Sequence, residues 1–156
     1  MAPERVYEQA AVAAWREGEG GAEVLLISAR GGDAPGGGRR WVLPQGGVEP
    51  GETPVQAAAS EAWEEAGVEG EVEPRPFAGF EYEIGAGRCR VSAFRMRVAW
   101  EAPDWPERDE RERRWLPWRE AAAAVSGETL RGVLERFRPP GEGEAKPKGM
   151  EGEEAG

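Results

Sequence analysis

The sequence contains no histidine, which removes both the commonest general base and the commonest zinc ligand. Cysteine is nearly absent as well. Cys89 stands alone, so an internal disulfide is excluded, a thiolate metal cluster has no support, and no histidine could activate the thiol. We therefore expect Cys89 to be a small buried residue. Chemistry in this chain must come from carboxylates, the one thiol, hydroxyls, lysine or arginine.

Long apolar runs are also missing, and the N-terminus carries no basic region followed by an apolar stretch. We therefore expect neither a membrane-spanning segment nor a secretory signal, and predict a cytoplasmic location without a membrane partner. Basic residues are outnumbered, with 20 lysines and arginines against 30 acidic residues and a net charge of −10. This charge disfavours a stable nucleic-acid partner, and a polyanionic ligand would need a local basic patch.

The apolar and glycine patterns predict one domain over residues 4–138. Strands are predicted over residues 7–16, 22–30, 41–43, 77–84, 88–100 and 115–118, and helices over 53–66, 119–125 and 128–137. The glycine-rich stretches 31–40 and 46–51 are expected to be a mobile loop and a turn. Residues 139–156 are rich in Pro, Gly, Glu and Lys without periodicity, so a disordered tail is expected there.

The helix over residues 53–66 has clear sequence boundaries. Thr53 can cap it, Pro54 suits its first position, and Gln56 completes a capping box. Gly67 tolerates the left-handed conformation that ends many helices.

Three glutamates, Glu61, Glu64 and Glu65, stand on this helix at i, i+3 and i+4, within an arc of about 100°. A different face of the helix is apolar and can bury against a sheet, so the glutamates should project away from the sheet. Like charges at this spacing destabilise a helix, and oxygen ligands suit a hard cation such as Mg²⁺, which also binds water and phosphate. For three glutamates alone, a solvated acidic surface is the alternative interpretation.

The loop before the helix adds the decisive pattern. Loop and helix together resemble the Nudix box, G-x₅-E-x₇-R-E-U-x-E-E-x-G-U, where U is aliphatic. The matching residues are Gly46, Glu52, Glu61, Glu64, Glu65, Gly67 and Val68. Ala62, at an aliphatic position, is a mild departure, whereas Ser60 replaces an arginine that is thought to orient the glutamates in the family. Ser60 leaves open reduced activity, a compensating arginine elsewhere, or a non-catalytic protein.

This resemblance implies an α+β Nudix fold, an α/β/α sandwich with a mixed β-sheet between helices. It implies metal-dependent hydrolysis of a pyrophosphate bond, in which Mg²⁺, or Mn²⁺ in its place, activates a water that attacks phosphorus. The implied metal ligands are Glu61, Glu64, Glu65 and the Gly46 carbonyl, with one glutamate as general base. Because all three glutamates are present, we expect an active enzyme, in which Glu52 supports the loop and the helix.

A second, looser similarity is to the diphosphoinositol polyphosphate phosphohydrolase branch of the family. It rests on residues 41–52, on the end of the helix, and on Asp104-Trp105-Pro106-Glu107 with the arginines that follow. It implies a diadenosine polyphosphate or a diphosphoinositol polyphosphate as substrate, held by arginines that bind phosphate oxygens. The candidates are Arg30, Arg39, Arg40, Arg88, Arg111, Arg113 and Arg114. Each arginine could instead belong to a solvated surface of mixed charge.

Other functions remain open at this stage. Nucleoside triphosphates, nucleotide sugars and capped RNA are alternative substrates, and a non-catalytic nucleotide-binding Nudix module is the alternative from a different functional class. The expected partner is a small polyphosphate, and the chain could be a monomer or a homodimer.

Overall fold

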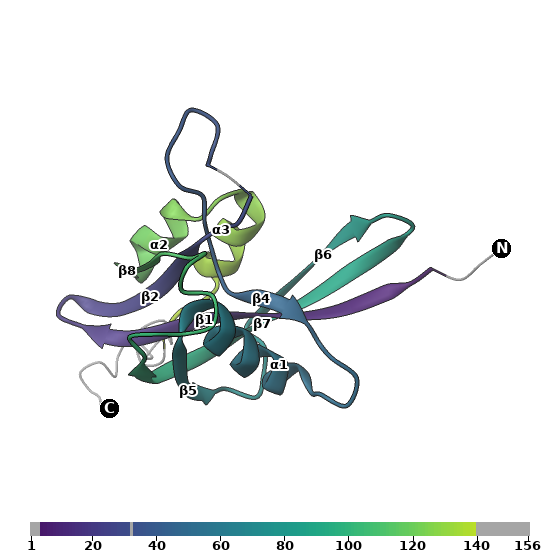
Figure 1. The fold of residues 1–156 in the computed structure, drawn as a ribbon, viewed down its shortest axis with the longest axis horizontal. Coiled ribbons are helices and arrows are strands. Elements are labelled where there is room, and N and C mark those ends of the chain that lie inside the picture. The colour runs from purple at the N-terminus through teal and green to yellow at the C-terminus, as the bar shows by residue number, and fades with distance from the viewer. Residues whose placement is uncertain (1–3, 32, 140–156) are drawn as a thin grey trace, which may run out of the picture.

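Strand β1 (Val6–Gly18) runs through the middle of a mixed sheet in the computed structural model, which describes residues 4–31 and 33–139 (Figure 1). It pairs in parallel with β7 (Gly87–Glu101) and antiparallel with β2 (Gly21–Ser28). The other strands are β3 (Trp41–Val42), β4 (Gln45–Gly47), β5 (Val68–Val72), β6 (Ala78–Ile84) and β8 (Arg113–Pro117). The sheet order is β3-β2-β1-β7-β5, with β4 on β1, β6 on β7 and β8 on β2.

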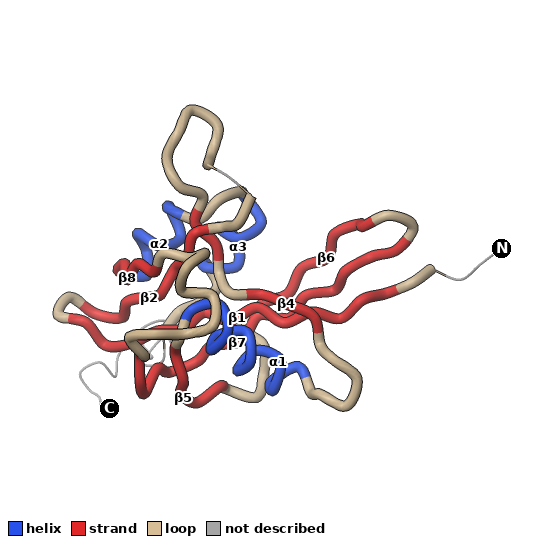
Figure 2. The backbone as a smooth tube through the Cα atoms, in the orientation of Figure 1, coloured by secondary structure: helices blue, strands red, loops and turns tan. Residues whose placement is uncertain are grey.

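Helices cover both faces of this sheet, which confirms the predicted α/β/α sandwich (Figure 2). The elements on one face are α1 (Pro54–Glu61) and a π-helical turn, η1 (Ala62–Ala66), and those on the other are α2 (Trp118–Ala124) and α3 (Glu128–Glu135). Successive side chains of a strand point to opposite faces. Ala10 and Val12 of β1 therefore pack toward α1, whereas Ala11 and Ala13 pack toward α2 and α3.

Two strands differ from the sequence expectation. The predicted turn at residues 46–51 contains most of β4, which pairs with β1 and carries too few apolar side chains to show a strand pattern. Strand β5 is absent from the prediction because Glu69, Gly70 and Glu71 interrupt its apolar pattern. Backbone pairing with β7 forms β5 as an edge strand despite this sequence.

The described residues between β2 and β3 form no helix or strand, and the chain there extends away from the sheet, at the top of Figure 1. The β6–β7 hairpin, predicted around Gly85-Ala86-Gly87, is confirmed and extends from the body of the domain beside the start of β1. Apart from Pro139, the tail predicted over residues 139–156 lies outside the described residues.

Candidate active site

The acidic helix, which carries Glu61, Glu64 and Glu65, consists of α1 and η1, and these two parts differ in geometry. Thr53 caps α1: its hydroxyl accepts a hydrogen bond from the Gln56 N–H, and the Gln56 side chain accepts one from the Thr53 N–H, which confirms the capping box. After Glu61 the helix widens into η1, and it ends at Gly67, whose φ of 69° is left-handed. A π-helical turn contains an extra residue, so it changes the direction of the side chains that follow.

Glu61 and Glu65 meet across this wider turn. Glu65 is 9% exposed, and the carboxyl groups of the two residues are hydrogen bonded. Burial first, then the hydrogen bond and charge of Glu65, raise the pKa of Glu61 to about 8. Burial also raises the pKa of Glu65. Two carboxyl groups that repel each other at a partly buried point form a place where a cation would be stabilised.

Glu64 differs from this pair in its exposure, although its charge also contributes to the raised pKa of Glu61. Its side chain is exposed and has no hydrogen-bond or ion-pair partner among residues 4–31 and 33–139. The expectation that all three glutamates project away from the sheet is therefore wrong for Glu65, which points inward after the π-helical turn. The role of Glu64 as a metal ligand stays a prediction.

Strand β4 lies directly against the glutamate pair. The Gln45 N–H donates to Glu65 Oε1 at 3.0 Å, which fixes one carboxylate oxygen. A Cβ atom at Gly46 would lie 2.3 Å from the carboxyl carbon of Glu61, so the absence of a side chain there makes room for Glu61. The glycine of this motif thus permits close packing of the loop on the acidic helix.

Ser60, at the departure from the Nudix box, binds the loop glutamate. Its hydroxyl donates to Glu52 Oε2 at 3.3 Å, while Glu52 Oε1 accepts from the Glu49 N–H at 2.9 Å. Glu52 therefore joins the loop to the helix, in agreement with the supporting role expected for it.

Arg111 places a positive charge beside the glutamate pair. Its Nη2 lies 3.5 Å from Glu65 Oε2, its Nε donates to Glu107 at 2.9 Å, and its Nη1 donates to the Ser28 carbonyl at 2.9 Å. The Arg111 side chain is only 8% exposed. Arg30 binds the same Glu107 at 3.0 Å, so two of the predicted arginines converge near the acidic helix.

Two more predicted arginines stand at the end of the β2–β3 loop. Arg39 forms an ion pair with Glu112 at 2.9 Å. Arg40 donates to the Arg30 carbonyl at 3.0 Å, and this bond holds the two ends of the loop together.

Arg88 lies on β7 and Arg114 lies on β8, the strand that follows β7 along the chain. Arg88, next to the β6–β7 turn, forms ion pairs with Glu4 at 3.1 Å and with Glu81 at 3.2 Å. Arg114 on β8 is exposed, and its guanidinium lies 5.7 Å from the centre of the Trp41 ring.

The Arg113 side chain is hydrogen bonded to backbone carbonyls. Its Nη1 donates to the carbonyls of Ala66 at 3.1 Å and Ala102 at 2.9 Å, and its guanidinium stacks 3.8 Å from the centre of the Trp105 ring. Burial lowers the pKa of Arg113. These contacts of Arg113 link the segment after β7 to the end of the acidic helix.

The binding of substrate by any of the seven arginines stays a prediction.

A cavity of about 460 Å³ adjoins Glu65 and Arg111. Phe80 and Tyr82 of β6 also line it, and their rings are stacked with centres 6.4 Å apart. Residues 126–130, which run from the loop after α2 into the first turn of α3, also line it, as do Val42, Leu43 and Gln45. The sequence analysis did not single out Phe80 or Tyr82, although their i, i+2 spacing on a predicted strand was the signal that both share one face.

Comparison with known proteins identifies the family. The sequence model of the NUDIX domain matches residues 7–137, which is most of the chain. The chain belongs to the Nudix family. Among curated relatives, the mitochondrial Nudix hydrolase 12 of Arabidopsis thaliana is 39% identical over 104 residues, covering 62% of this chain and 51% of that protein. The chloroplastic Nudix hydrolase 21 of the same plant is 34% identical over 128 residues, covering 78% of this chain and 60% of that protein.

Solved structures share the Nudix fold. An Ap4A hydrolase of C. elegans, in a binary complex, superimposes with a TM-score of 0.62 at 23% identity and covers 84% of this chain and 94% of its own. The MutT protein of Methanosarcina mazei Go1 gives a TM-score of 0.65 at 21% identity, with coverages of 88% and 96%. By contrast, this Nudix chain spans about half the length of the first curated relatives it matches.

The structure bears on the predicted absence of a membrane-spanning segment, whereas the names of the relatives bear on the predicted cellular compartment. No helix among the described residues of this Nudix domain is long and apolar enough to cross a membrane. Relatives carry mitochondrial and chloroplastic names, so the cytoplasmic location stays a prediction, as does the oligomeric state.

Nudix hydrolases generally use divalent metal ions, and the donor groups of this site fit such an ion. Glu61 and Glu65 supply oxygen ligands at a shared point, and burial raises the pKa of both carboxyl groups, so a bound cation would favour their charged forms. Within the described part of the chain, no three acidic or cysteine side chains gather closely enough to hold an ion alone. An ion at this pair would complete its coordination with loop carbonyl, phosphate or water oxygens.

Proposed function

We propose that this Nudix domain hydrolyses a pyrophosphate bond of a dinucleoside polyphosphate, such as a diadenosine polyphosphate, with Mg²⁺ held by Glu61 and Glu65. The observation that carries the proposal is the hydrogen-bonded glutamate pair next to a cavity with an aromatic wall. The C. elegans Ap4A hydrolase, whose name states such a substrate, shares the fold.

The residues around the pair have distinct roles in this mechanism. A bound divalent ion supplies charge neutralisation at the phosphate oxygens and lowers the pKa of a water ligand. The Gln45 N–H and Arg111 each contact one oxygen of Glu65, so this carboxylate is oriented before substrate binds. Glu64 is exposed and has no side-chain partner in the described residues, so it is free to accept the proton of the attacking water.

The site also supports catalysis over the non-catalytic alternative. Ser60 removes the positive charge that the Nudix box normally places beside its glutamates, but Arg111 provides one from the segment before β8. Arg111 is anchored by Glu107 and by the Ser28 carbonyl, so its guanidinium has a fixed position. We infer that Arg111 is the compensating arginine that the sequence left open.

The cavity favours a nucleotide over an inositol pyrophosphate. Phe80, Tyr82, Val42 and Leu130 give it apolar and aromatic surface that suits a planar base. A diphosphoinositol polyphosphate carries phosphates around its ring and would need several arginines. Of the seven predicted arginines, Arg111 alone is among the described residues that line this cavity.

Analysis of phosphate products tests the proposal. The chain is incubated with Mg²⁺ or with chelator, and with diadenosine polyphosphates of increasing length, a diphosphoinositol polyphosphate, nucleoside triphosphates and ADP-ribose. We expect chelator-sensitive turnover that is highest for the diadenosine compounds. Turnover confined to the inositol compound would overturn the substrate, and no turnover on any compound would leave a binding module as the function.

Phe80→Leu provides a matched test of the aromatic wall. We expect it to raise KM for diadenosine tetraphosphate about tenfold with little change in kcat, because it removes base stacking while leaving the glutamates in place. Leu130→Ile, a change on the same cavity wall that keeps the apolar volume, is the control and should leave KM within about twofold.

A further inference from the structure

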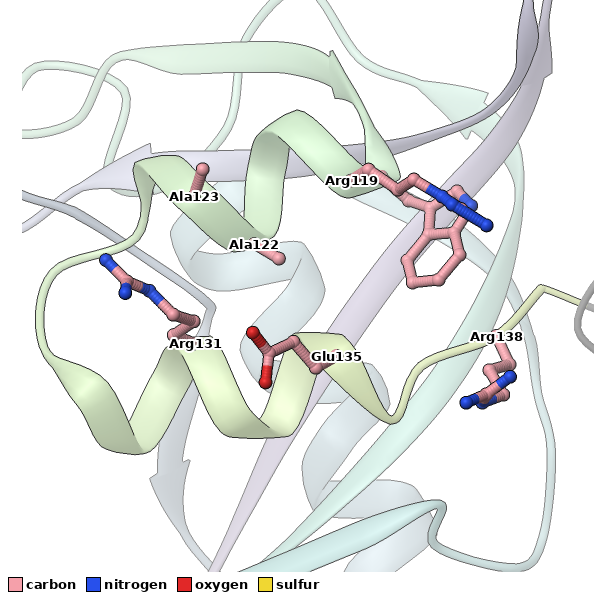
Figure 3. A pocket seen from close by; sticks show the side chains of 7 residues that line it. Arg119, Ala122, Ala123, Arg131, Glu135 and Arg138 are labelled. Atoms are coloured by element: carbon pink, nitrogen blue, oxygen red, sulfur yellow. The ribbon is translucent and has the colours of Figure 1, made fainter.

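A second cavity, of about 550 Å³, lies between α2 and α3 and is lined by cationic side chains. Arg119 comes from α2, Arg131 from α3 and Arg138 from the segment after α3, while Ala122 and Ala123 leave the space between them open (Figure 3). No residue of the Nudix box lines this cavity. Its volume lies in the range of pockets that hold small ligands.

Among the described residues, these three arginines have no carboxylate partner, in contrast to other arginines of the chain. Arg30, Arg39, Arg88 and Arg95, for example, each form an ion pair within 3.2 Å. Within residues 4–31 and 33–139, the guanidinium groups of Arg119, Arg131 and Arg138 form no ion pair and no hydrogen bond. In a chain with a net charge of −10, three arginines without an ion-pair partner among the described residues make a local excess of positive charge around this cavity.

Arg119 is held in place by an aromatic ring. Its guanidinium lies 4.8 Å from the centre of the Trp118 ring, and Trp118 packs in turn against the buried Phe137 with ring centres 6.0 Å apart. A cation over an aromatic face loses side-chain freedom without losing its charge. Arg119 therefore keeps its donors available for an anion.

Arg138, which lines the cavity, has an unusual backbone conformation. Its φ of 40° is left-handed, and it is the one non-glycine residue of the described chain with a positive φ. Arg95 stabilises this conformation, because its Nη1 donates to the carbonyl of Phe137 and, at 3.0 Å, to that of Arg138. This backbone conformation is unfavourable for arginine, and such outliers are concentrated at functional sites.

Glu135 is the single acidic residue among the described residues that line this cavity. Figure 3 shows it on α3, one turn from Arg131. With three arginines against one glutamate, the lining has an excess of two positive charges. An anion with more than one negative charge would satisfy this excess, and arginine forms paired hydrogen bonds with phosphate oxygens.

We propose that this cavity is a second anion site, which binds the phosphate groups of a small phosphorylated compound independently of the glutamate site. The ligand class is a compact oligophosphate, either free or as the phosphate chain of a nucleotide. Trp118 already stacks on Arg119, so the cavity offers phosphate contacts without a free aromatic platform for a base. The site needs no metal and does not depend on the proposed hydrolase activity.

Calorimetric titration with tripolyphosphate, in chelator so that no divalent ion reaches the glutamates, tests the site on the full chain. Arg131→Gln and Arg138→Gln should each weaken binding about tenfold, because each removes a charge-assisted phosphate contact. The matched control is Arg75→Gln, which removes one exposed positive charge outside the cavity and should leave affinity within about twofold. Glu135→Gln should tighten binding severalfold, since it removes the one repulsive carboxylate.

The outcomes separate the proposal from its alternatives. Equal affinity for tripolyphosphate and ATP, both weakened by Arg131→Gln, would support recognition of the phosphate chain from either source. Equal losses for Arg131→Gln and Arg75→Gln would show nonspecific attraction and overturn the site. Absence of binding in the native chain, or binding of ATP with none of tripolyphosphate, would overturn it as well, whatever the hydrolase assays show.

Discussion

At the scale of single residues, the site combines carboxyl groups that repel each other with one arginine that partly offsets the repulsion. Glu61 has a pKa of about 8, so without a cation it is largely protonated near neutral pH. Arg111 and the Gln45 N–H favour the charged form of its neighbour Glu65. The two members of the pair therefore differ. Protein groups favour the charged form of Glu65, whereas the charged form of Glu61 depends more on a bound ion.

Arg111→Gln should destabilise the chain and reduce its turnover. The substitution leaves the buried Glu65 without its cation and removes one of the two arginines that bind Glu107, and removing one partner of a buried ion pair costs about 3 kcal/mol. Urea unfolding in chelator measures this loss. The control is Arg108→Gln, whose side chain is 58% exposed and lies 3.7 Å from Asp104, and which should change the free energy of unfolding by less than about 0.5 kcal/mol. Equal stabilities of the two variants would contradict the role of Arg111.

Glu65→Gln should preserve the fold and lower kcat by about a hundredfold or more, because it removes a ligand charge at nearly constant shape. The measurement is steady-state turnover with Mg²⁺, with the circular dichroism spectrum as the check on folding. Glu69→Gln, an exposed change on β5, is the control and should retain near-native turnover. Near-native turnover of the Glu65 variant would remove Glu65 from the active site.

At the scale of elements, the π-helical turn η1 is the feature that the sequence could not reveal. The caps of the acidic helix followed from Thr53, Gln56 and Gly67, because capping depends on local residue types. The widening after Glu61 has no comparable local signal, so an ideal helix placed all three glutamates on one exposed face. The structure instead turns Glu65 inward, toward Gln45 and Arg111.

The other elements show the same contrast between a local sequence signal and a dependence on distant residues. The hairpin of β6 and β7 and the closing helices were predictable because alternation and helical spacing are visible in a single segment. Strands β4 and β5 were not, since backbone pairing with a distant strand defines them. The same limit applies to the contact of Arg111 with Glu65, which joins two segments 46 positions apart in the printed sequence.

Gly67→Ala tests the end of the acidic helix. A Cβ atom there would meet the Trp105 ring at 2.8 Å, and the φ of 69° disfavours any side chain. We expect a loss of about 1 to 2 kcal/mol in the free energy of unfolding, measured with urea. Gly20→Ala is the matched control because nothing lies within 4 Å of its Cβ position and its φ is not positive, so its loss should be smaller. A Gly67 variant as stable as the Gly20 variant would contradict this account.

At the scale of the whole molecule, the raised pKa of Glu61 makes stability depend on pH and on metal. Between an unfolded value of 4.5 and a folded value of about 8, the folded state binds more protons than the unfolded state. In chelator, this group should therefore lower stability as pH rises from about 5 to 8. The thermal midpoint of the native chain should fall relative to that of Glu61→Gln over this range.

Excess Mg²⁺ should reverse the fall in thermal midpoint that the native chain shows relative to Glu61→Gln as pH rises. The ion binds the deprotonated pair, so the gain in thermal midpoint on adding Mg²⁺ should be larger at pH 8 than at pH 5. The Glu61→Gln variant should show a smaller gain. Parallel pH profiles of the native chain and this variant, with and without Mg²⁺, would contradict the coupling of Glu61 to the metal.

The parallel pairing of β1 with β7 has a consequence for the order of synthesis. Val6 pairs with Arg88, and Trp15 with Arg97, so β1 is synthesised well before the strand with which it pairs, and the sheet cannot close until β7 follows. Pairings this distant in sequence are slow to form because the chain loses the entropy of loop closure before the stabilising contacts are made. Until β7 emerges, the apolar residues of β1 and β2 stay exposed, so the nascent chain needs protection from aggregation while residues 29–86 are translated.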